Sequence, residues 1–556
     1  MNIIRSVVLT ALAALLLTAS PARAEWHQAS SDNFVIYSDS KPKNLRRFAE
    51  MLEHYHVALG LLTGREVPKP SPSNRVTIYV VGSERTLRKL YGDKNSSVAG
   101  FYIPRAGGSR AFVPRVRVST GEPDFSVTVL LHEYAHHFLI SSSRHAMPRW
   151  FSEGAAEFFS SARMRKDALD IGRPAYHRGA ELVYGDLVTV EQLMDPEKYK
   201  EAHGNNLASF YGRSWALYHY LYFSPERKGQ LTDYWNTVAS GSTPLEAAEQ
   251  VFGDLEKLEK ELLVYLNLRK ISSYRIKKTI LPIGPIDIVE MSPGMDEMLP
   301  IIIRSQRGVT EEEALELLPE AQEIAAEFPN DPGVLAALAE AEFDAGNTQQ
   351  AIEAADRAIA IDPATKPAYI QKGFALFKLA EDAEDADAAF KAAMQPFTAL
   401  NRLENDHPLP LIYFYRSYVQ GGREPSETAR HALERASELA PFDLSLAFNV
   451  GIMQASEGKI DLAASTLAPL AANPHGGGQA DAAKFLIDQL NKSPEGEPFL
   501  PNFDEFEDAL ESSGDGTDDA ATDGENEDGE EPDGVGADGV SADGEDAKGD
   551  TPDDPV

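Results

Sequence analysis

Cysteine is absent from the 556-residue sequence, and its absence excludes disulfides, a thiol nucleophile, cysteine-ligated metals and a lipid-modified N-terminal cysteine. Any metal that the chain binds must therefore be held by His, Asp or Glu. Without disulfides, the folded parts must be stabilised by their apolar cores. At about 150 residues per domain, the length predicts two to four folded units.

The sequence also lacks a basic stripe. Its formal net charge is −35, and the segment from Asp504 to Val556 alone contains 22 acidic residues and one lysine. With no basic surface to neutralise phosphates, nucleic acid is excluded as a partner. The same segment has hardly any large apolar side chains, so we expect residues 496–556 to form a disordered acidic tail. A solvated tail explains such a charge run; calcium binding, self-repulsion and occlusion of a site are the alternatives.

Long apolar runs are confined to the N-terminus. Arg5 supplies a positive charge, residues 7–18 form an apolar core, and Ala22-Arg23-Ala24 form a small-x-small cleavage site. Residues 1–24 are therefore predicted to be a cleavable export signal; an uncleaved anchor is the alternative, but the run is shorter than the ~20 residues that a bilayer core requires. No stable membrane insertion is expected after cleavage. For an exported chain without cysteine, a bacterial periplasm is favoured over a eukaryotic secretory route, and secretion from the cell is the other destination.

Residues 25–305 combine strand and helix patterns, which predicts an α+β domain. An apolar helix is expected from Ser126 to Ile140, and the strand just before it, Ala111–Val113, is expected to be the exposed edge of the sheet. A strand-like connector, Arg275 to Arg304, ends the domain, and its residues 279–281 and 286–288 are candidates to complete the sheet. The other predicted elements are the strands Phe34–Tyr37, Val76–Val81 and Phe101–Pro104 and the helix Leu45–Leu62.

Residues 306–495 are helical and repetitive. Units begin near Pro332, Lys366, Pro410 and Leu444, and an offset of 34 residues recurs between the first two and between the last two. With small residues where paired helices would cross, the pattern resembles tetratricopeptide repeats, which stack into an all-α superhelix and bind proteins. Residues 311–329 read as half of an earlier unit, and ordinary antiparallel helices are the alternative. Because such repeats bury their apolar faces against one another, we expect a separate folding unit that recruits a substrate or a protein partner.

The strongest chemical signal is His132-Glu133-Tyr134-Ala135-His136, an H-E-x-x-H motif on the predicted helix. Residues four apart lie one above the other on a helix, so both imidazoles can face one ion. Glu133 is turned by about 100° and can reach a water molecule bound to that ion. Two histidines on a helix are also found as ordinary buried side chains, so a third ligand decides the interpretation.

That ligand is expected on the next helix, in Trp150-Phe-Ser-Glu153-Gly154-Ala-Ala156-Glu157. Catalytic zinc commonly takes three protein ligands and leaves a fourth position for water, and two His with one Glu is a standard set. Glu153 is the candidate. Glu157, one turn later, is placed to hydrogen-bond the second nitrogen of a ligating imidazole, although a surface carboxylate would have the same spacing.

The combination of the two motifs resembles the zinc-site signature of the gluzincin metallopeptidases, and most closely the bacterial peptidase-MA-like proteins that join such a domain to tetratricopeptide repeats. The resemblance covers residues 25–265. It implies a zincin-like fold, a zinc ion (Zn2+) held by His132, His136 and Glu153, and hydrolysis of a peptide or protein substrate with Glu133 as the general base.

The resemblance also implies a Tyr or His further along the chain that stabilises the oxyanion. Tyr211 is the best candidate, while Tyr218, Tyr220 and Tyr222 compete with it and a core aromatic stripe is the alternative. His137 and His145 are expected outside the ligand set.

Two departures from the family limit what can be carried over. The interval from His136 to Glu153 is slightly shorter than in the aminopeptidase N relatives, and the Gly-x-Met-Glu-Asn-like stretch is missing, so aminopeptidase specificity does not transfer. The competing hypothesis is a periplasmic repeat scaffold whose metal domain is inactive or structural, and a third is hydrolysis of a non-protein substrate such as an epoxide. A structural site does not need the carboxylate of Glu133, so its presence favours catalysis.

Overall fold

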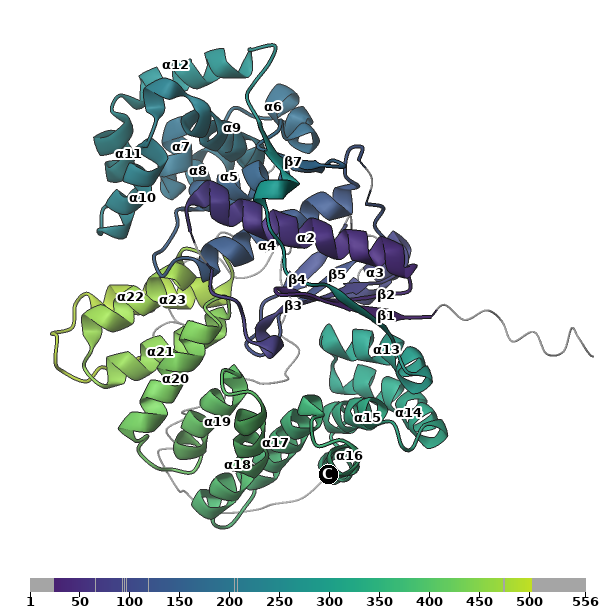
Figure 1. Ribbon diagram of the computed structural model, residues 1–556. Helices are drawn as coiled ribbons and strands as arrows, with labels where there is room; N and C mark the ends of the chain where they lie inside the picture. The colour runs from purple at the N-terminus through teal and green to yellow at the C-terminus, as the bar shows by residue number, and fades with distance from the viewer. Residues whose placement is uncertain are drawn as a thin grey trace, which may run out of the picture.

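The computed structural model describes residues 25–502, except residues 66, 93, 95, 97, 119, 205, 208, 474 and 475. The expected export signal and residues 503–556 of the expected acidic tail lie outside the described residues. Within the described part, no helix has both the length and the apolar character needed to cross a bilayer. Figure 1 shows a central sheet with a helical region above it and a curved row of helices below it.

A six-stranded mixed sheet forms the centre of the α+β domain, with the strand order β4-β5-β3-β2-β1-β9. The three strands β2, β3 and β5 are parallel, whereas β1, β4 and β9 run antiparallel to their neighbours. Strands β2, β3, β4 and β5 match the predicted strand segments to within one residue at either end, whereas no strand was predicted at the position of β1. The strands are β1 (His27–Ser30), β2 (Phe34–Ser38), β3 (Val76–Val80), β4 (Phe101–Ile103), β5 (Arg110–Val113) and β9 (Asp287–Glu290).

The edge of the sheet beside the long helix α4 (Phe125–Ser141) is β4, and the prediction that residues 111–113 form that edge is wrong. Strand β5 pairs with β3 on one side and with β4 on the other. Strand β4 folds back on β5 through a loop in which Gly107 and Gly108 adopt positive φ, so the earlier strand in the chain covers the later one. Order along the sequence therefore did not reveal the edge.

The two faces of the sheet pack against different helices, as the alternation of side chains along a strand requires. On one face, Ile36 and Ile78 share a core with α2 (Pro42–Thr63) and α4. On the other, Tyr79 and Phe112 pack with α3 (Glu84–Tyr91) and with helix α13 (Pro293–Gln306). Both faces of the sheet are therefore covered by helices.

The expected connector from Arg275 to Arg304 is only partly strand-like. Strand β8 (Tyr274–Lys277) pairs with β7 (Ala168–Ile171) in a small second sheet, and β9 pairs with β1 and so extends the main sheet as proposed for residues 286–288. Thr279 and Ile280 lie in a 3₁₀ turn instead. From Pro293 onward the connector is helical, because the Ser292 hydroxyl caps α13 by accepting from the Met295 N–H and the proline suits the first turn.

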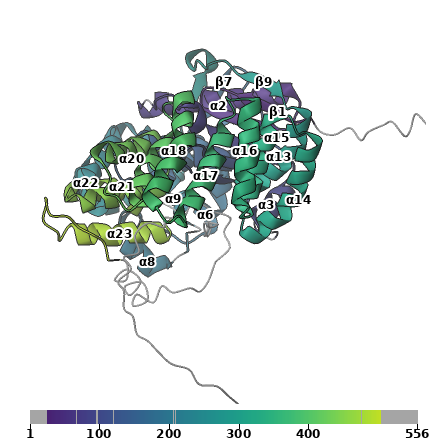
Figure 2. The ribbon, with the colours of Figure 1, turned by 90° about the horizontal axis from the view of Figure 1, so that it is seen from below.

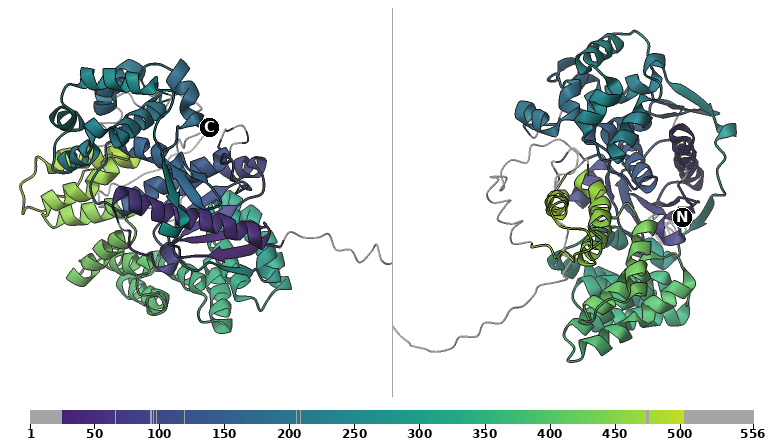
Figure 3. Two further views of the ribbon diagram at one scale, coloured as in Figure 1. Left: turned by 45° about the horizontal axis from the view of Figure 1, so that its top comes forward. Right: turned by 90° about the vertical axis from the view of Figure 1, so that its left-hand side faces the viewer.

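A mostly helical region between α4 and β8 completes the α+β domain, and Figure 3 shows it on the opposite side of the sheet from the array. Its central pair is α5 and α9, which pack closely on each other, and α5 also packs on α4. Its elements are α5 (Arg149–Ser160), β6 (Arg163–Met164), β7 (Ala168–Ile171), η2 (Tyr176–Arg178), α6 (Gly179–Tyr184), α7 (Val190–Met194), α8 (Pro196–His203), α9 (Phe210–Phe223), α10 (Gln230–Ala239), α11 (Pro244–Phe252) and α12 (Leu255–Leu266).

The C-terminal part is an all-helical repeat region in which successive helices pack in pairs. In Figure 2, which is seen from below, these helices form an arc in front of the sheet. Units begin at residues 332, 366 and 444 as predicted, and the third begins at residue 408. Small residues lie at crossings: a Cβ on Gly373 would lie 2.5 Å from the ring of Phe397. We call α13–α23 the array; its helices after α13 are α14 (Glu311–Glu327), α15 (Pro332–Asp344), α16 (Thr348–Ile361), α17 (Lys366–Glu381), α18 (Ala386–Leu403), α19 (Pro408–Val419), α20 (Glu427–Leu439), α21 (Leu444–Ser456), α22 (Ile460–Ala471) and α23 (Gly478–Leu490).

The array does not bury its apolar surface only within itself, in contrast to the expectation from the repeats. Helix α13 places Leu299 and Ile303 in the core beneath the sheet and Met298 and Ile301 in the first core of the array. Farther along the array, the Glu404 carboxylate accepts hydrogen bonds from the N–H and the hydroxyl of Ser73 at 2.9 and 2.6 Å. The two parts share a core because α13 has two apolar faces; the domain boundary after residue 305 stays a prediction.

Candidate metal centre

The two predicted site helices meet so that three donors converge. His132 Nε2 lies 3.1 Å from His136 Nε2, and the Glu153 Oε2 atom lies 3.2 Å from the first nitrogen and 3.3 Å from the second. His132 and His136 are 5 % exposed and Glu153 is fully buried. Among the described residues, these three form the one group of at least three His or acidic side chains spaced to hold a metal ion.

The motif Trp150-x-x-Glu153-Gly154 packs helix α5 against α9 and α10. Every residue from Trp150 to Ser160 is buried, and the indole N–H of Trp150 donates to the Tyr234 hydroxyl at 2.9 Å. A Cβ on Gly154 would lie 2.6 Å from the Ser214 carbonyl oxygen of α9. Glycine at this position therefore allows the close approach of α9 that fixes the height of Glu153 beside the two histidines.

Glu157 has the position that its spacing predicted. Its Oε1 lies 3.3 Å from His132 Nδ1, so that when Nε2 carries the lone pair, the Nδ1–H points at this carboxylate. The same carboxylate meets His177 Nε2 at 2.6 Å and accepts from the Arg178 guanidinium at 2.8 Å. Burial by itself raises the pKa of Glu157, but Arg178, His132 and His177 outweigh burial, and the pKa lies well below its usual range.

His132 responds to the same carboxylates. Burial lowers the pKa of its imidazole, but Glu153 and Glu157 more than compensate and hold that pKa well above its usual value. The two carboxylates therefore favour the protonated form of His132. A metal cation in the same position would replace that proton.

Three supporting residues were not found from the sequence. Ser152 Oγ lies 3.1 Å from His136 Nδ1, which fixes the second imidazole as Glu157 fixes the first. His177 and Arg178 come from η2, a short turn about 20 positions further along the chain than Glu157. Ser152 could have been noticed because it precedes Glu153 on the same helix. Nothing in the local pattern distinguishes His177 or Arg178 from other surface residues of a loop.

Glu133 is half-buried on α4, turned away from the two ligand positions. Among the described residues, no hydrogen bond or ion pair involves its carboxylate, and its charge acts on the hydroxyl of Tyr102 on the edge strand β4. The side chain is therefore not committed to a structural contact, as a proton acceptor requires.

The tyrosines that are candidates for stabilising an oxyanion differ in their contacts. Tyr218 is buried among Phe151, Phe158 and Phe159, so it belongs to the aromatic core between α5 and α9. The other two competing hydroxyls have partners elsewhere: Tyr220 donates to Glu261 and Tyr222 donates to the Leu62 carbonyl.

Tyr211 has a different neighbourhood. The Arg178 guanidinium lies 4.6 Å from the centroid of its ring, and Arg178 also binds Glu157. Arg178 thus connects Tyr211 to the candidate metal centre. The alternative, a stripe of aromatic core residues, describes Tyr218. Its role in stabilising an oxyanion stays a prediction.

His137 and His145 lie outside the ligand set, as expected. His137 Nδ1 is 2.6 Å from the Tyr102 hydroxyl, and burial together with nearby His56 lowers the pKa of His137 to about 3. His145 is exposed beside Trp235.

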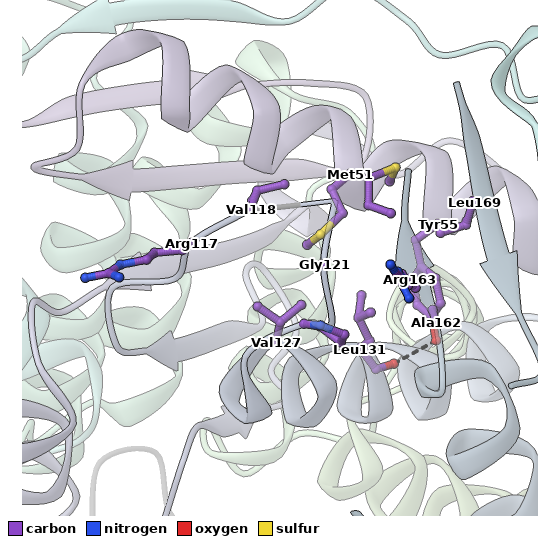
Figure 4. Close-up of a pocket in the computed structure, with 12 residues that line it drawn as sticks. Met51, Tyr55, Arg117, Val118, Gly121, Val127, Leu131, Ala162, Arg163 and Leu169 are labelled. Atoms are coloured by element: carbon purple, nitrogen blue, oxygen red, sulfur yellow. Dashed lines mark hydrogen bonds between the residues drawn. The ribbon is translucent and has the colours of Figure 1, made fainter. Parts of the chain in front are cut away.

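A small cavity lies on the opposite side of α4 from the donors, and Figure 4 shows the residues that line it. Its apolar wall includes Met51, Val127 and Leu131, and the Tyr55 hydroxyl there donates to the Leu131 carbonyl at 3.0 Å. None of the three metal-site donors lines it.

No protein-family model matches the sequence, and no curated protein matches it either. Among solved structures, a thermophilic TPR protein of Thermus thermophilus is 18% identical over 35% of this chain and 98% of its own, with a TM-score of 0.30. MamA from Desulfovibrio magneticus is 20% identical over 37% of this chain and 99% of its own, with a TM-score of 0.25. The yeast protein Tom70 is 13% identical over 66% of this chain and 85% of its own, with a TM-score of 0.23. These similarities are too weak to carry a function to this chain.

Proposed function

We propose that this chain is an exported zinc-dependent peptidase of the gluzincin type. The observation that carries the proposal is the triangle formed by His132 Nε2, His136 Nε2 and Glu153 Oε2, whose sides measure 3.1, 3.2 and 3.3 Å. Donors bound at about 2.0–2.2 Å to a tetrahedral zinc ion lie roughly 3.3–3.6 Å apart, so this triangle fits zinc with little movement.

The chemistry of the donors also fits zinc. Two imidazoles and one carboxylate are a common catalytic set for this ion, and three protein ligands leave one position for water. A bound zinc ion supplies Lewis acidity and lowers the pKa of a bound water to about 7. Calcium and magnesium prefer sites made of oxygen ligands, so the two histidines argue against them.

The residues around the ion have separate tasks in the proposal. Glu133 takes a proton from the attacking water and later returns it to the leaving amine of the peptide bond. Tyr211 donates a hydrogen bond to the carbonyl oxygen as negative charge develops there. Glu157 and Ser152 hold the two imidazoles in the tautomers that leave Nε2 free to bind the metal.

The array has a separate role in the proposal. Curved helical repeats are typical binding surfaces for proteins, so we propose that the array recruits a substrate or a protein partner. The N-terminal pattern supports export to a bacterial periplasm or beyond the cell.

Glu133→Gln tests the proposal against the alternative of an inactive or structural metal domain. The purified mature protein should bind about one zinc ion per chain. The variant should keep that metal and the fold, because the amide preserves the shape of the side chain. It should lose a peptidase activity measured on degenerate peptide libraries by a factor of about 10²–10⁴, because the amide cannot accept a proton.

Three results would decide against the proposal. Absence of zinc in the wild-type protein removes the metal centre. A wild-type protein that binds zinc but cleaves no peptide library favours the alternative, a repeat scaffold with an inactive or structural metal domain. Equal rates for wild type and Glu133→Gln remove the proposed base.

A further inference from the structure

The edge strand β4 and the site helix α4 run side by side in the same direction. A Cβ on Gly100, just before β4, would lie 3.6 Å from Val129 on α4. Two turns later on the helix, His137 Nδ1 meets the Tyr102 hydroxyl at 2.6 Å. Glu133 lies between Val129 and His137 on this stripe of α4 and acts electrostatically on Tyr102. A peptide that adds to the sheet beside its outermost strand β4 would therefore pass the proposed base.

The array bridges this pair of elements at the C-terminal end of α4. The Phe442 ring lies 4.5 Å from that of His137, and the backbone N–H of Ala106, after β4, donates to Asp443 Oδ2 at 2.8 Å. Ala106 and Ile140, the latter from the end of α4, both pack against one array cluster, which includes Phe442. The array residues Phe442 and Asp443 thus contact both the end of α4 and the loop that follows β4.

A second contact strengthens the bridge. Arg144, just after α4, pairs with Glu438 of α20 at 3.1 Å. The Asn74 side chain donates to the Leu439 carbonyl of the same helix end at 3.1 Å and accepts from the Gly107 N–H at 3.0 Å. These bonds hold the loop between β4 and β5 on the array.

The other end of the pair is built differently. A cleft there is lined by Val98 and Ala99, which precede β4, and by Phe125 and Ser126 at the start of α4. All the residues that line it belong to the α+β domain. Phe125 is 55 % exposed. The array therefore contacts one end of the pair of β4 and α4, and a cleft lies at the other.

We propose that the array closes one end of the substrate path along β4, so that the site accepts only a few residues of substrate on that side and cleaves near a chain end. The inference rests on the proposed peptidase function. It deepens that function by assigning the substrate class: short peptides or terminal segments of longer chains. A substrate strand antiparallel to β4 would place its amino-terminal residues at the closed end, and a parallel strand its carboxyl-terminal residues.

The test compares three forms of one degenerate hexapeptide library: unextended, and extended at either end by about eight Gly-Ser residues, roughly 26 Å when extended. Cleavage is followed by mass spectrometry with the full-length, zinc-loaded protein. We expect an extension on one side to slow cleavage on the order of tenfold and an extension on the other side to change it less than about twofold. The side that is slowed reports the direction of the substrate.

Variants at the bridge identify the array as the cause. Phe442→Ala should restore cleavage of the disfavoured library, whereas Phe390→Ala, which truncates a buried phenylalanine in the array's core of α17, α18 and α19, should not. Asp443→Ser is a milder second variant, because serine keeps the N-cap of α21 but is too short to reach the Ala106 N–H.

The outcomes separate the two claims. Equal cleavage of both extended libraries by the wild type overturns the closure and leaves the peptidase function intact. A one-sided preference that is unchanged in both Phe442→Ala and Asp443→Ser also overturns it, because the array is then not the barrier. Absence of cleavage of all three libraries by zinc-loaded protein overturns the peptidase function on which the inference rests.

Discussion

Two buried carboxylates, Glu153 in the candidate metal centre and Glu404 in the array, differ in what surrounds them. Glu404 accepts from the Lys366 ammonium at 2.6 Å and from the N–H and hydroxyl of Ser73. Burial raises the pKa of Glu404, but Lys366 and Ser73 outweigh burial and lower it to about 2. Glu153 instead points one oxygen at two imidazoles, 3.2 Å from His132 Nε2 and 3.3 Å from His136 Nε2.

The comparison separates a structural carboxylate from one placed for a ligand. A buried charge surrounded by fixed donors contributes to folding without any further group. A buried carboxylate beside two imidazoles is next to groups whose charge depends on a proton, and a bound metal cation would take the place of that proton.

The largest effect should separate these two carboxylates. Glu153→Ala should abolish stoichiometric zinc binding, since one of three ligands is lost, and should hardly change the stability of the metal-free protein. Glu404→Ala should keep zinc but lower the free energy of unfolding by about 3 kcal/mol, because it leaves Lys366 and the Ser73 N–H unpaired. Metal analysis and denaturant unfolding measure both effects. Zinc retained by Glu153→Ala, or lost in Glu404→Ala, would contradict the comparison.

The second prediction concerns pH. The folded-state pKa of Glu404, about 2, is below the value near 4.3 expected in the unfolded chain, so its contribution to stability is present above about pH 4.3 and is lost as pH falls toward 2. That contribution amounts to about 3 kcal/mol at most. Unfolding of Glu404→Gln should therefore depend less on pH over this interval than unfolding of the wild type. Parallel profiles for the two proteins would show that Glu404 does not titrate in this way.

The third prediction concerns the residue behind the metal. Glu157→Gln should weaken zinc binding about 10–100-fold, because the amide is a weaker acceptor for the His132 N–H. Glu181→Gln is the matched control, since Glu181 also pairs with Arg178 but touches neither histidine of the H-E-x-x-H motif. Competition with a chelator of known affinity measures both variants. If the two variants bind zinc equally well, Glu157 does not orient His132.

Sequence patterns were sufficient wherever the interaction is local. The pair His132 and His136 follows from the rise and turn of a single helix, and the array helices that begin at Pro332 and Lys366 follow from a repeat period. Glu153 was predicted because the motif Trp150-x-x-Glu153-Gly154 on the next helix supplies an acidic side chain as the third ligand. The connector was predicted to be strand-like as far as Arg304, although Ser292-Pro293 is a helix-start signal. The helix that begins at Pro293 was therefore missed.

The sequence by itself determined that His132 and His136 share one face of a helix, most strands of the main sheet and the helical repeats, because each follows from a periodicity within one segment or from a fixed repeat length. Only the tertiary structure decided that β4 covers β5 at the sheet edge, that His177 and Arg178 support Glu157, and that Phe442 packs on His137. Those contacts join residues that are distant in the chain, and they are selected by shape and charge in the packed protein rather than by local backbone preference.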